Sequence, residues 1–430
     1  MALFLYNLVF PLLFVVYLPF YMIHLFKRGG MDRFFWERLG LYTREKKERL
    51  SRLSRPVWIH AVSVGEAVAA TGFIRRWREE RPDLDFVLST TTTTGQAIAR
   101  KNLPDGVVLI YCPLDIWCAV RRVLGLINPR LLMIFEVEYW PCLITQSVKR
   151  GTPVVLANGR MSDKSAAGYA RHAWFFRPLF EKFSLFCMQS DADVRRIRQV
   201  VGDAVPAVAC DTMKFDQVPD VAGTDRSDLL NHVFGSGEKL IWTVGSTHAN
   251  EEALIADVYQ MLKREFPALK VILVPRHHER TAEVEAELRK RDLTWTRLDN
   301  GSQEPAAGVD ILLVNKTGEL MSFYETADIV YVGKSLAGCE GGHNIIEPAI
   351  FGKPIAHGPN MQNFRLVVEL FKQAGASIEV KNDDGLLPAM RDLCANPERR
   401  RELSEKSRRV VTASRGAMTR TLGHVKQILP

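Results

Sequence analysis

The residues with the clearest chemical potential lie in the second half of the chain, where residues 341–347 run through two glycines to a carboxylate, Glu347. Glycines let a phosphate approach the backbone, and the N–H groups of a helix start bind its charge. A carboxylate one turn later suits two vicinal ribose hydroxyls. The pattern favours a nucleotide or nucleotide-sugar site, although a Gly-Gly pair before a helix is by itself more often a simple turn.

Three further polar segments follow predicted strands in the same half. Residues 245–248 offer a phosphate-binding turn, residues 275–280 supply cations, and residues 317–320 add a carboxylate. Each could be only a loop or a helix cap. Because the carboxyl ends of parallel strands meet at one edge of a sheet, the four segments together predict a nucleotide-binding domain.

The first half carries a carboxylate in a comparable place, at Glu66. Residues 60–66 run from a strand through Gly65 into a helix, so Glu66 is expected at a helix N-terminus that faces a cleft. A carboxylate there can take a proton from an acceptor hydroxyl, as an inverting sugar transfer requires. The alternative is a carboxylate that only caps the helix.

Other polar residues of the first half also follow predicted strands. They are Glu136, Glu138, Lys214 and residues 158–162. Asp83 and Asp85 match the Asp-x-Asp pattern that binds metal in some glycosyltransferases, but they precede a strand and are interpreted as surface residues. Seven dispersed cysteines without a Cys-x-x-Cys pair indicate reduced thiols. We expect neither a metal site nor disulfides.

Strand-like and helical segments alternate twice along the chain. Apolar strands separated by amphipathic helices predict parallel sheets covered on both faces. The expected strands are residues 57–62, 86–90, 107–110, 131–135, 154–157 and 185–188 in the first half, and 240–244, 270–274, 311–314, 329–332 and 354–356 in the second. A polar stretch around residues 217–227 predicts a linker between two Rossmann-like, doubly wound α/β domains that face a cleft.

The first 26 residues contain no Asp, Glu, Lys or Arg, and this run is long enough to span a membrane as a helix. In a signal peptide, the competing interpretation, basic residues should precede the apolar run. Here Lys27 and Arg28 follow it, which favours an uncleaved anchor with the catalytic body in the cytoplasm. We expect an anchor at 1–26, a first domain at 27–217 and a second at 218–430.

The segment from Lys27 to Arg55 holds ten Lys/Arg and four Asp/Glu, a net of +6 out of +8 for the whole chain. Phe34, Phe35 and Trp36 lie among these cations, as in a segment that contacts a membrane surface. A solvated helical face is the alternative. The rest of the chain nets only +2, which argues against a nucleic-acid partner.

Taken in order, these motifs closely resemble those of the bacterial 3-deoxy-D-manno-octulosonic acid (Kdo) transferases of lipid A assembly. The matching segments are residues 60–66, 136–141, 158–162, 214–216, 245–248, 275–280, 318–320 and 341–347. The resemblance implies a GT-B glycosyltransferase fold, a CMP-Kdo donor, a lipid A precursor as acceptor, and inversion without a metal or another cofactor. It also implies an enzyme at the bacterial inner membrane, with an acceptor domain followed by a donor domain.

Residue roles follow where the motifs match. Glu66 resembles the family's catalytic base, and Glu136 and Lys214 resemble the groups that stabilise the transition state. The implied donor contacts are Pro275, Arg276, Gly318, Glu319, Asn344 and Glu347, together with the neighbouring Thr317, Ile345 and Ile346. Two positions depart from the family's pattern, which usually has Met at Thr317 and a second Gly-Ser where this chain has Lys334-Ser335. Lys334 could change how the donor is held.

Two other functions remain open from the residues alone. One is a GT-B transferase or epimerase that uses a UDP-sugar, which turnover of labelled CMP-Kdo against UDP-sugars distinguishes. The other is a non-catalytic, membrane-anchored protein that binds a nucleotide-sugar and does not need Glu66.

Overall fold

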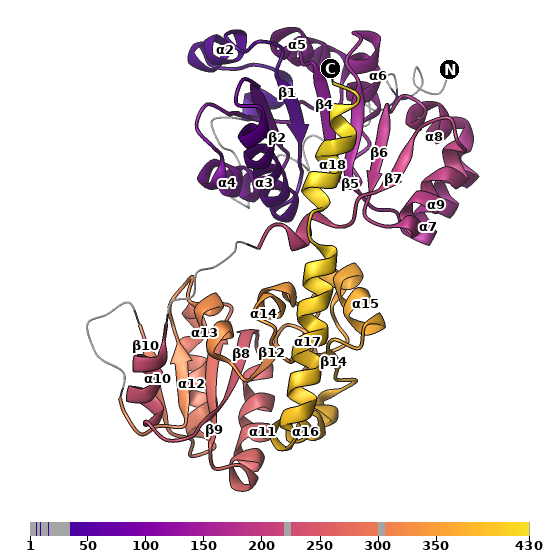
Figure 1. The fold of residues 1–430 in the computed structure, drawn as a ribbon. Helices are drawn as coiled ribbons and strands as arrows, with labels where there is room; N and C mark the ends of the chain where they lie inside the picture. Colours follow the sequence, from indigo (N-terminus) through magenta and orange to yellow (C-terminus); the bar gives the residue numbers. More distant parts are fainter. Residues whose placement is uncertain are drawn as a thin grey trace. The chain divides into compact units, whose positions relative to one another are not determined.

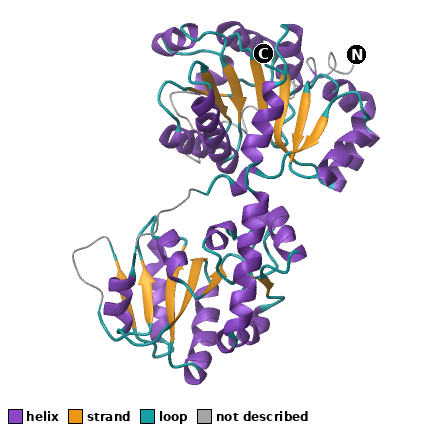
Figure 2. Cartoon of the chain, in the orientation of Figure 1, coloured by secondary structure: helices purple, strands orange, loops and turns teal. Residues whose placement is uncertain are grey.

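The computed structural model describes Tyr6, Val9, Val16 and residues 35–218, 225–299 and 306–429. Contacts divide the chain into two compact units. Unit 1 comprises Met1–Gln217 and Arg415–Pro430, and unit 2 comprises Val218–Ser414. Each unit is a parallel sheet with helices packed against it (Figures 1 and 2). The expected doubly wound α/β fold is confirmed.

Unit 1 is built on a seven-stranded sheet with the order β3-β2-β1-β4-β5-β6-β7. The strands are β1 (Val57–His60), β2 (Phe86–Thr90), β3 (Val108–Tyr111), β4 (Leu131–Phe135), β5 (Val154–Gly159), β6 (Leu185–Met188) and β7 (Ala207–Ala209). Both neighbours of β1 run parallel to it. The order reverses between β1 and β4, which makes the carboxyl ends of these two strands the switch point where doubly wound sheets bind ligands.

Helices cover both faces of this sheet. They are η1 (Phe35–Leu39), α2 (Arg44–Ser51), α3 (Val64–Glu80), α4 (Thr93–Asn102), α5 (Trp117–Ile127), α6 (Pro141–Lys149), α7 (Asp163–Arg171), α8 (Ala173–Phe180), α9 (Asp191–Val201), η2 (Met213–Phe215) and α18 (Ala417–Lys426). Strand side chains alternate between the faces. Trp58 therefore packs into one buried cluster, while Val57 and Ile59 pack into the other.

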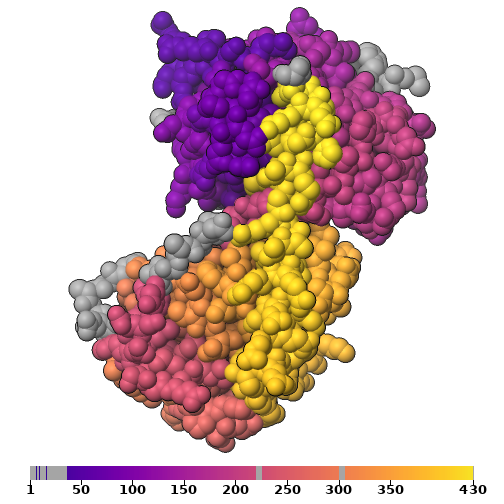
Figure 3. All heavy atoms as spheres, viewed as in Figure 1, coloured from indigo at the N-terminus to yellow at the C-terminus, as the bar shows by residue number. Residues whose placement is uncertain are grey.

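Helix α18 belongs to unit 1, although it follows unit 2 in the sequence. Met418 and Leu422 are buried in the same cluster as Phe73 of α3, and the yellow atoms of α18 lie against the indigo atoms of the first half of unit 1 in Figure 3. Asp216 accepts the backbone N–H groups of Gly416 and Met418 at 2.7 Å each. The second domain expected at 218–430 therefore ends at Ser414, because the apolar face of α18 is buried in unit 1.

Unit 2 is also built on a seven-stranded sheet, with the order β10-β11-β9-β8-β12-β13-β14. Its strands are β8 (Leu240–Thr247), β9 (Leu269–Pro275), β10 (Trp295–Leu298), β11 (Ile311–Val314), β12 (Ile329–Val332), β13 (Ile355–His357) and β14 (Ile378–Glu379). Its helices are α10 (Ser227–Phe234), α11 (Glu251–Glu265), η3 (His278–Arg280), α12 (Thr281–Arg289), α13 (Leu320–Thr326), α14 (Ile346–Ile350), η4 (Gln362–Phe364), α15 (Arg365–Gln373), η5 (Asp383–Gly385), α16 (Leu386–Ala395) and α17 (Pro397–Ser414). The switch point lies between β8 and β12.

The expected membrane anchor, residues 1–26, lies outside the described residues except for Tyr6, Val9 and Val16. The Tyr6 hydroxyl donates to Asp115 at 2.9 Å, and this carboxylate also accepts the N–H groups of Cys142 and Leu143 at the start of α6. In the described part of the chain, no helix is both long and apolar enough to cross a bilayer.

Candidate functional site

Glu66 lies in the first turn of α3, directly after the carboxyl end of β1. Its carboxylate accepts the Val62 N–H and the Ser63 hydroxyl, each at 2.8 Å, while Ser63 Oγ accepts the Glu66 N–H at 3.3 Å. This exchange resembles a capping box, so the capping role considered for Glu66 is real. The side chain is held in one position and is 6% exposed. Each carboxylate oxygen keeps a lone pair for a further donor.

Glu136 follows β4, on the other side of the same switch point. Its backbone has φ of 60°, a left-handed conformation that non-glycine residues adopt at a cost. Its carboxylate is paired with Arg160 at 2.9 Å. Burial raises the pKa of Glu66, the Val62 N–H opposes this, and the negative charge of Glu136 raises it further. The two carboxylates expected in the site therefore lie within electrostatic reach of each other.

Glu138, two residues further on, completes an acidic group with these carboxylates. Burial, followed by the negative charges of Glu66 and Glu136, raises the pKa of Glu138 to about 7. A carboxyl with a pKa near 7 can hold or release a proton under physiological conditions.

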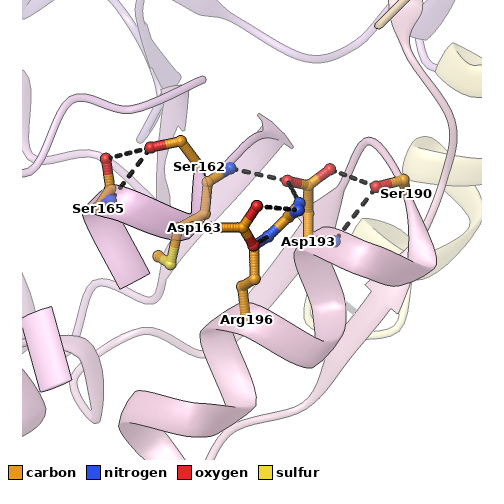
Figure 4. A network of polar contacts seen from close by, with 7 residues as sticks. Ser162, Asp163, Ser165, Ser190, Asp193 and Arg196 are labelled. Atoms are coloured by element: carbon orange, nitrogen blue, oxygen red, sulfur yellow. Dashed lines mark hydrogen bonds and ion pairs between the residues drawn. The ribbon is translucent and has the colours of Figure 1, made fainter. Parts of the chain in front are cut away.

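The loop after β5, which carries Arg160, is fixed by the polar network in Figure 4. Asp193 of α9 accepts the Met161 N–H at 2.8 Å and the Ser190 hydroxyl. Arg196 pairs with Asp163 through two hydrogen bonds of 2.6 and 3.1 Å. Because the starts of α7 and α9 are tied together in this way, the network positions Arg160 beside Glu136.

Lys214 lies in η2, after the edge strand β7, yet the chain brings it back towards Glu136. Asn158, at the end of β5, accepts the N–H of Met213 at 3.0 Å. Burial lowers the pKa of Lys214, the charge of Glu136 opposes this shift, and Arg160 adds to it. The three residues expected to be catalytic, Glu66, Glu136 and Lys214, are therefore brought together in unit 1.

Asp83 and Asp85 lie just before β2, away from this group. Asp83 is 60% exposed and pairs with Arg81 at 2.7 Å, and Asp85 accepts the Ser54 N–H at 2.7 Å. The interpretation of Asp83 as a surface residue is consistent with this exposure.

In unit 2 a buried carboxylate, Glu251 of α11, joins the two loops at the switch point. It accepts the backbone N–H groups of His248, Lys334, Ser335 and Leu336 at 2.7–3.1 Å and the hydroxyl of Tyr331 at 3.1 Å. Backbone N–H groups that converge in this way make an anion site. Here the anion is the protein's own carboxylate. The turn at residues 245–248, expected to bind phosphate, thus has its His248 N–H occupied.

The other expected phosphate turn, residues 341–347, is also bonded internally. Asn344 Oδ1 accepts the Ile346 N–H at 3.1 Å, and the Gly342 N–H donates to the carbonyl of Lys334 at 2.9 Å. Ile345 and Ile346 are fully buried, so their side chains face the core. The N–H groups of Gly342 and Ile346 are therefore in use within the protein, which leaves fewer backbone donors for an anion than the sequence indicates.

Glu347 and Arg276, two of the donor contacts expected from the sequence, lie within electrostatic reach of each other. Asn344 Nδ2 donates to Glu347 at 3.2 Å. Burial raises the pKa of Glu347, while Asn344 and the charge of Arg276 act in the opposite direction. Arg276 directly follows Pro275, the last residue of β9, and its side chain is exposed. Glu347 can accept hydroxyl groups here, and Arg276 can bind an oxyanion.

Thr317, Gly318 and Glu319 form the loop between β11 and α13. Gly318 has φ of 91°, a conformation that glycine adopts without strain. Glu319 is paired with Arg226 and, at 2.8 Å, with Lys316. Its carboxylate therefore fixes the loop, and the exposed Thr317 and Gly318 are the parts of the loop open to a ligand.

Histidines from three loops meet at the edge formed by β8, β9 and β12. His248 Nε2 and His343 Nε2 are 3.0 Å apart, and their rings stack with centroids separated by 5.3 Å. His277 meets His248 edge-on, also at 5.3 Å. None of the three was singled out as a site residue from the sequence.

Comparison with known proteins places this arrangement in a family. Residues 33–217 match the family model of the 3-deoxy-D-manno-octulosonic-acid transferases (kdotransferase). The 3-deoxy-D-manno-octulosonic acid transferase of Haemophilus influenzae is 30% identical over 374 residues, which cover 87% of this chain and 87% of that protein. The chain belongs to this family. The enzyme of the same name from Bordetella pertussis is 31% identical over 385 residues, 86% of each chain.

This Kdo transferase is therefore an enzyme, a glycosyltransferase that transfers Kdo, and it has the GT-B fold. Solved structures of low sequence identity share that fold. UDP-GlcNAc 2-epimerase from Neisseria meningitidis, bound to UDP-GlcNAc, superimposes with a TM-score of 0.57 at 9% identity and covers 86% of this chain and 100% of its own. At such an identity the likeness concerns the fold alone.

Several residues that organise the Kdo transferase site were not singled out from its sequence. They are Asp216, His248, Glu251 and His343. All but Glu251 lie inside quoted motifs, so the sequence marked their neighbourhood but not their function. Glu251 had no such mark, because an acidic residue in the first turn of a helix is common for helix-dipole reasons alone.

Proposed function

We propose that this Kdo transferase takes Kdo from CMP-Kdo and transfers it, with inversion and without a metal, to a lipid A precursor in lipopolysaccharide assembly. Unit 1 is then the acceptor domain and unit 2 the donor domain. The observation that carries the proposal is the grouping of Glu66, Glu136 and Lys214 in unit 1, while Arg276 and Glu347 lie together in unit 2. This grouping matches a proton-accepting half and a nucleotide-binding half.

In unit 1, Glu66 acts as the general base. It accepts the proton of the acceptor hydroxyl as that oxygen forms a bond to the anomeric carbon of Kdo, and the bond from this carbon to the CMP phosphate breaks. Burial and the neighbouring Glu136 favour proton uptake by raising the pKa of Glu66. The hydrogen bonds from Val62 and Ser63 keep the carboxylate oriented throughout.

Lys214 and Glu136 act on the charges that develop in the transition state. Lys214 stabilises the departing phosphate or the Kdo carboxylate, because an ammonium group in a partly buried site interacts strongly with an oxyanion. Glu136 helps keep Lys214 protonated despite its burial. Arg160, paired with Glu136, balances the acidic group around Glu66.

In unit 2, Glu347 and Asn344 are proposed to hold the ribose hydroxyls of CMP, and Arg276 the phosphate. The backbone around Pro275, Ile345 and Ile346 and the loop of Thr317, Gly318 and Glu319 are proposed to border the nucleoside. In both segments the proposed contacts with the nucleoside are made by backbone atoms or by exposed side-chain atoms. The side chain of Glu319 is ion-paired, and those of Ile345 and Ile346 are buried.

The membrane is the proposed location of the acceptor and of the protein. We propose an anchor at residues 1–26 in the bacterial inner membrane, with both units on the cytoplasmic side. The segment that follows is basic, and its Trp36 is 58% exposed. On the same unit, Trp117 is 52% exposed and Arg121 lies over its ring at 5.0 Å. Exposed tryptophan beside cations suits the interface of an anionic membrane.

Turnover of labelled donors tests the proposal against its alternatives. Purified full-length protein in detergent, with a lipid A precursor, should transfer label from CMP-Kdo and not from UDP-sugars. Transfer from a UDP-sugar would favour the UDP-sugar enzyme. Binding of CMP-Kdo without any transfer would favour the non-catalytic binding protein.

A further inference from the structure

The donor is anionic, yet the backbone N–H groups expected to bind its charge are in use at several places in unit 2. Glu251 accepts the backbone N–H groups of His248 and of the three consecutive residues that begin at Lys334. Asn344 accepts that of Ile346. Fewer backbone N–H groups are thus left for an oxyanion at this edge, and side-chain donors carry more of its binding.

Lys334 supplies one such donor. It directly follows Gly333 at the end of β12 and has φ of 63°, a strained conformation for lysine. A Cβ atom built on Gly341 would lie 3.5 Å from Lys334 Nζ, so the ammonium group reaches the glycine turn that precedes His343. Within the described residues, neither Lys334 nor Arg276 forms an ion pair. Both cations are thus available to an anionic ligand.

The stacked pair of His248 and His343 supplies the second donor. With Nε2 atoms 3.0 Å apart, the Nε2–H of one neutral ring donates to the Nε2 lone pair of the other, and a proton added to the pair binds the remaining Nδ1 lone pair of the donor ring. Burial lowers the pKa of His248 to about 4 and that of His343 to about 3, and nearby positive charges add to both shifts. The pair is therefore neutral at pH 7.

The charged groups that face the histidine pair are cationic. They are Lys334, Arg276 and Arg280, together with the third histidine, His277. Of these, Arg280 is itself paired with Glu252 and Glu283. The carboxylate of Glu251 directs its oxygens to backbone N–H groups and to the hydroxyl of Tyr331. A bound oxyanion would offset these cations and make protonation of the pair more favourable.

We propose that the His248–His343 pair and Lys334 form the oxyanion subsite of the donor domain, and that the pair takes up a proton when the anion binds. The inference rests on the proposed function, because the anion is the donor's phosphate or the carboxylate of its sugar. Donor affinity then rises as pH falls, up to tenfold per pH unit where one full proton is taken up.

Titration calorimetry of the full-length protein in detergent tests this, with CMP and CMP-Kdo as separate ligands. Each titration is run from pH 5.5 to 7.5 in buffers of different ionisation enthalpy, which gives the number of protons taken up. The parent protein should take up protons increasingly as pH falls. His343→Gln and His248→Gln should remove the uptake, and His278→Gln, a change on an exposed ring of the same region, should retain it.

Lys334→Gly separates binding from folding. Glycine adopts the left-handed backbone of position 334 without strain, so this variant should melt at the same temperature as the parent or higher. It should nevertheless bind the anionic ligand about tenfold more weakly. Weakening towards both ligands identifies the phosphate as the bound group, and weakening towards CMP-Kdo alone identifies the carboxylate.

Several results would overturn the inference. They are the absence of proton uptake by the parent, uptake that survives in both histidine variants, and unchanged affinity of Lys334→Gly for both ligands. If these occur while Arg276→Ala still weakens CMP binding, the proposed function stands and only the subsite is wrong. If the parent binds neither CMP nor CMP-Kdo, both are wrong.

Discussion

Glu251 accepts the backbone N–H of Lys334 at 2.7 Å, and this bond ties the loop after β12 to the start of α11. The same carboxylate bonds the loop after β8, so a residue of the protein holds together both loops of the switch point in unit 2. Glycine is needed beside it, because a Cβ atom at Gly333 would approach the carbonyl oxygen of Ser246 to 2.7 Å. The donor edge is therefore rigid before any ligand binds, with side chains left to recognise charge.

Replacing Glu66 with Gln should lower turnover by roughly 10²–10⁴ while CMP affinity stays near that of the parent, because the amide cannot act as a base. Initial rates and CMP titrations measure the two effects. Ser63→Ala is the matched control, since it removes the cap of α3 but keeps the carboxylate. It should cost about 1 kcal/mol of stability. It should lower turnover far less than Glu66→Gln does, because the Val62 N–H still orients the carboxylate. A Gln variant with turnover within a few fold of the parent would remove Glu66 from the mechanism.

Arg276→Ala and Glu347→Ala should each weaken CMP binding by about tenfold or more, because each removes a charged partner of the nucleotide. Titration calorimetry with CMP measures this. Glu279→Ala is the control, since its side chain is 70% exposed on the loop that carries Arg276. If neither variant binds CMP more weakly than the control, the nucleotide is bound elsewhere.

Glu138→Gln should stabilise the protein more at pH 8 than at pH 5.5. The folded state raises the pKa of Glu138 from 4.5 to about 7, so the folded protein binds this proton more tightly than the unfolded chain does. Stability contributed by the group is consequently lost as pH rises through this interval. After allowance for partial exposure, the difference is about 1 kcal/mol. Denaturant unfolding at the two pH values measures it, with the exposed Glu79→Gln as control. An equal effect at both pH values would contradict the shift.

Asp216→Ala should loosen α18 and cost about 1–2 kcal/mol, because the carboxylate caps two N–H groups at the start of that helix. Thermal unfolding gives the cost, and hydrogen exchange shows whether it falls on residues 416–426. Asp211→Asn removes the charge of an ion pair whose carboxylate is 53% exposed, keeps a residue that tolerates the left-handed backbone of this position (φ 64°), and should cost less than 1 kcal/mol. Equal losses of unfolding free energy in the two variants would show that the cap stabilises the protein no more than an exposed ion pair does.

Deleting residues 1–26 should leave an enzyme that uses detergent-dispersed acceptor but works poorly on acceptor in vesicles. The remaining basic segment attracts anionic lipid by about 1 kcal/mol per cation, and salt screens this attraction. Binding of the truncated protein to anionic vesicles should therefore fall steeply between low and physiological salt, while the full-length protein stays bound. Binding that does not depend on salt would show that burial of apolar residues such as Trp36 dominates.

The parallel sheets could be predicted from the sequence because their central strands are continuous apolar runs, as at residues 131–135. The strands that were missed, β7, β10 and β14, are edge strands of two to four residues with partly exposed side chains, so their sequences carry little pattern. The return of α18 to unit 1 could not be predicted either. It depends on long-range burial of Met418 and on the cap from Asp216, which local periodicity does not encode.

Within the site, the sequence located the loops but not the bonds inside them. Motif spacing brought Glu66 and Glu136 to neighbouring strand ends. It could not show that Glu251 fills the expected anion site, because that depends on a contact between residues 83 positions apart. The pairing of His248 with His343 across 95 residues was hidden for the same reason.

The mass of the product tests the central claim most directly. Purified full-length protein is incubated with CMP-Kdo and a lipid A precursor, and the lipid is extracted for mass spectrometry, with Glu66→Gln as a parallel reaction. The account predicts that the precursor gains the mass of one or more Kdo residues with the parent protein and remains largely unmodified with the variant. An unmodified precursor after incubation with folded parent protein would contradict the account. An equal mass gain with Glu66→Gln would contradict it as well.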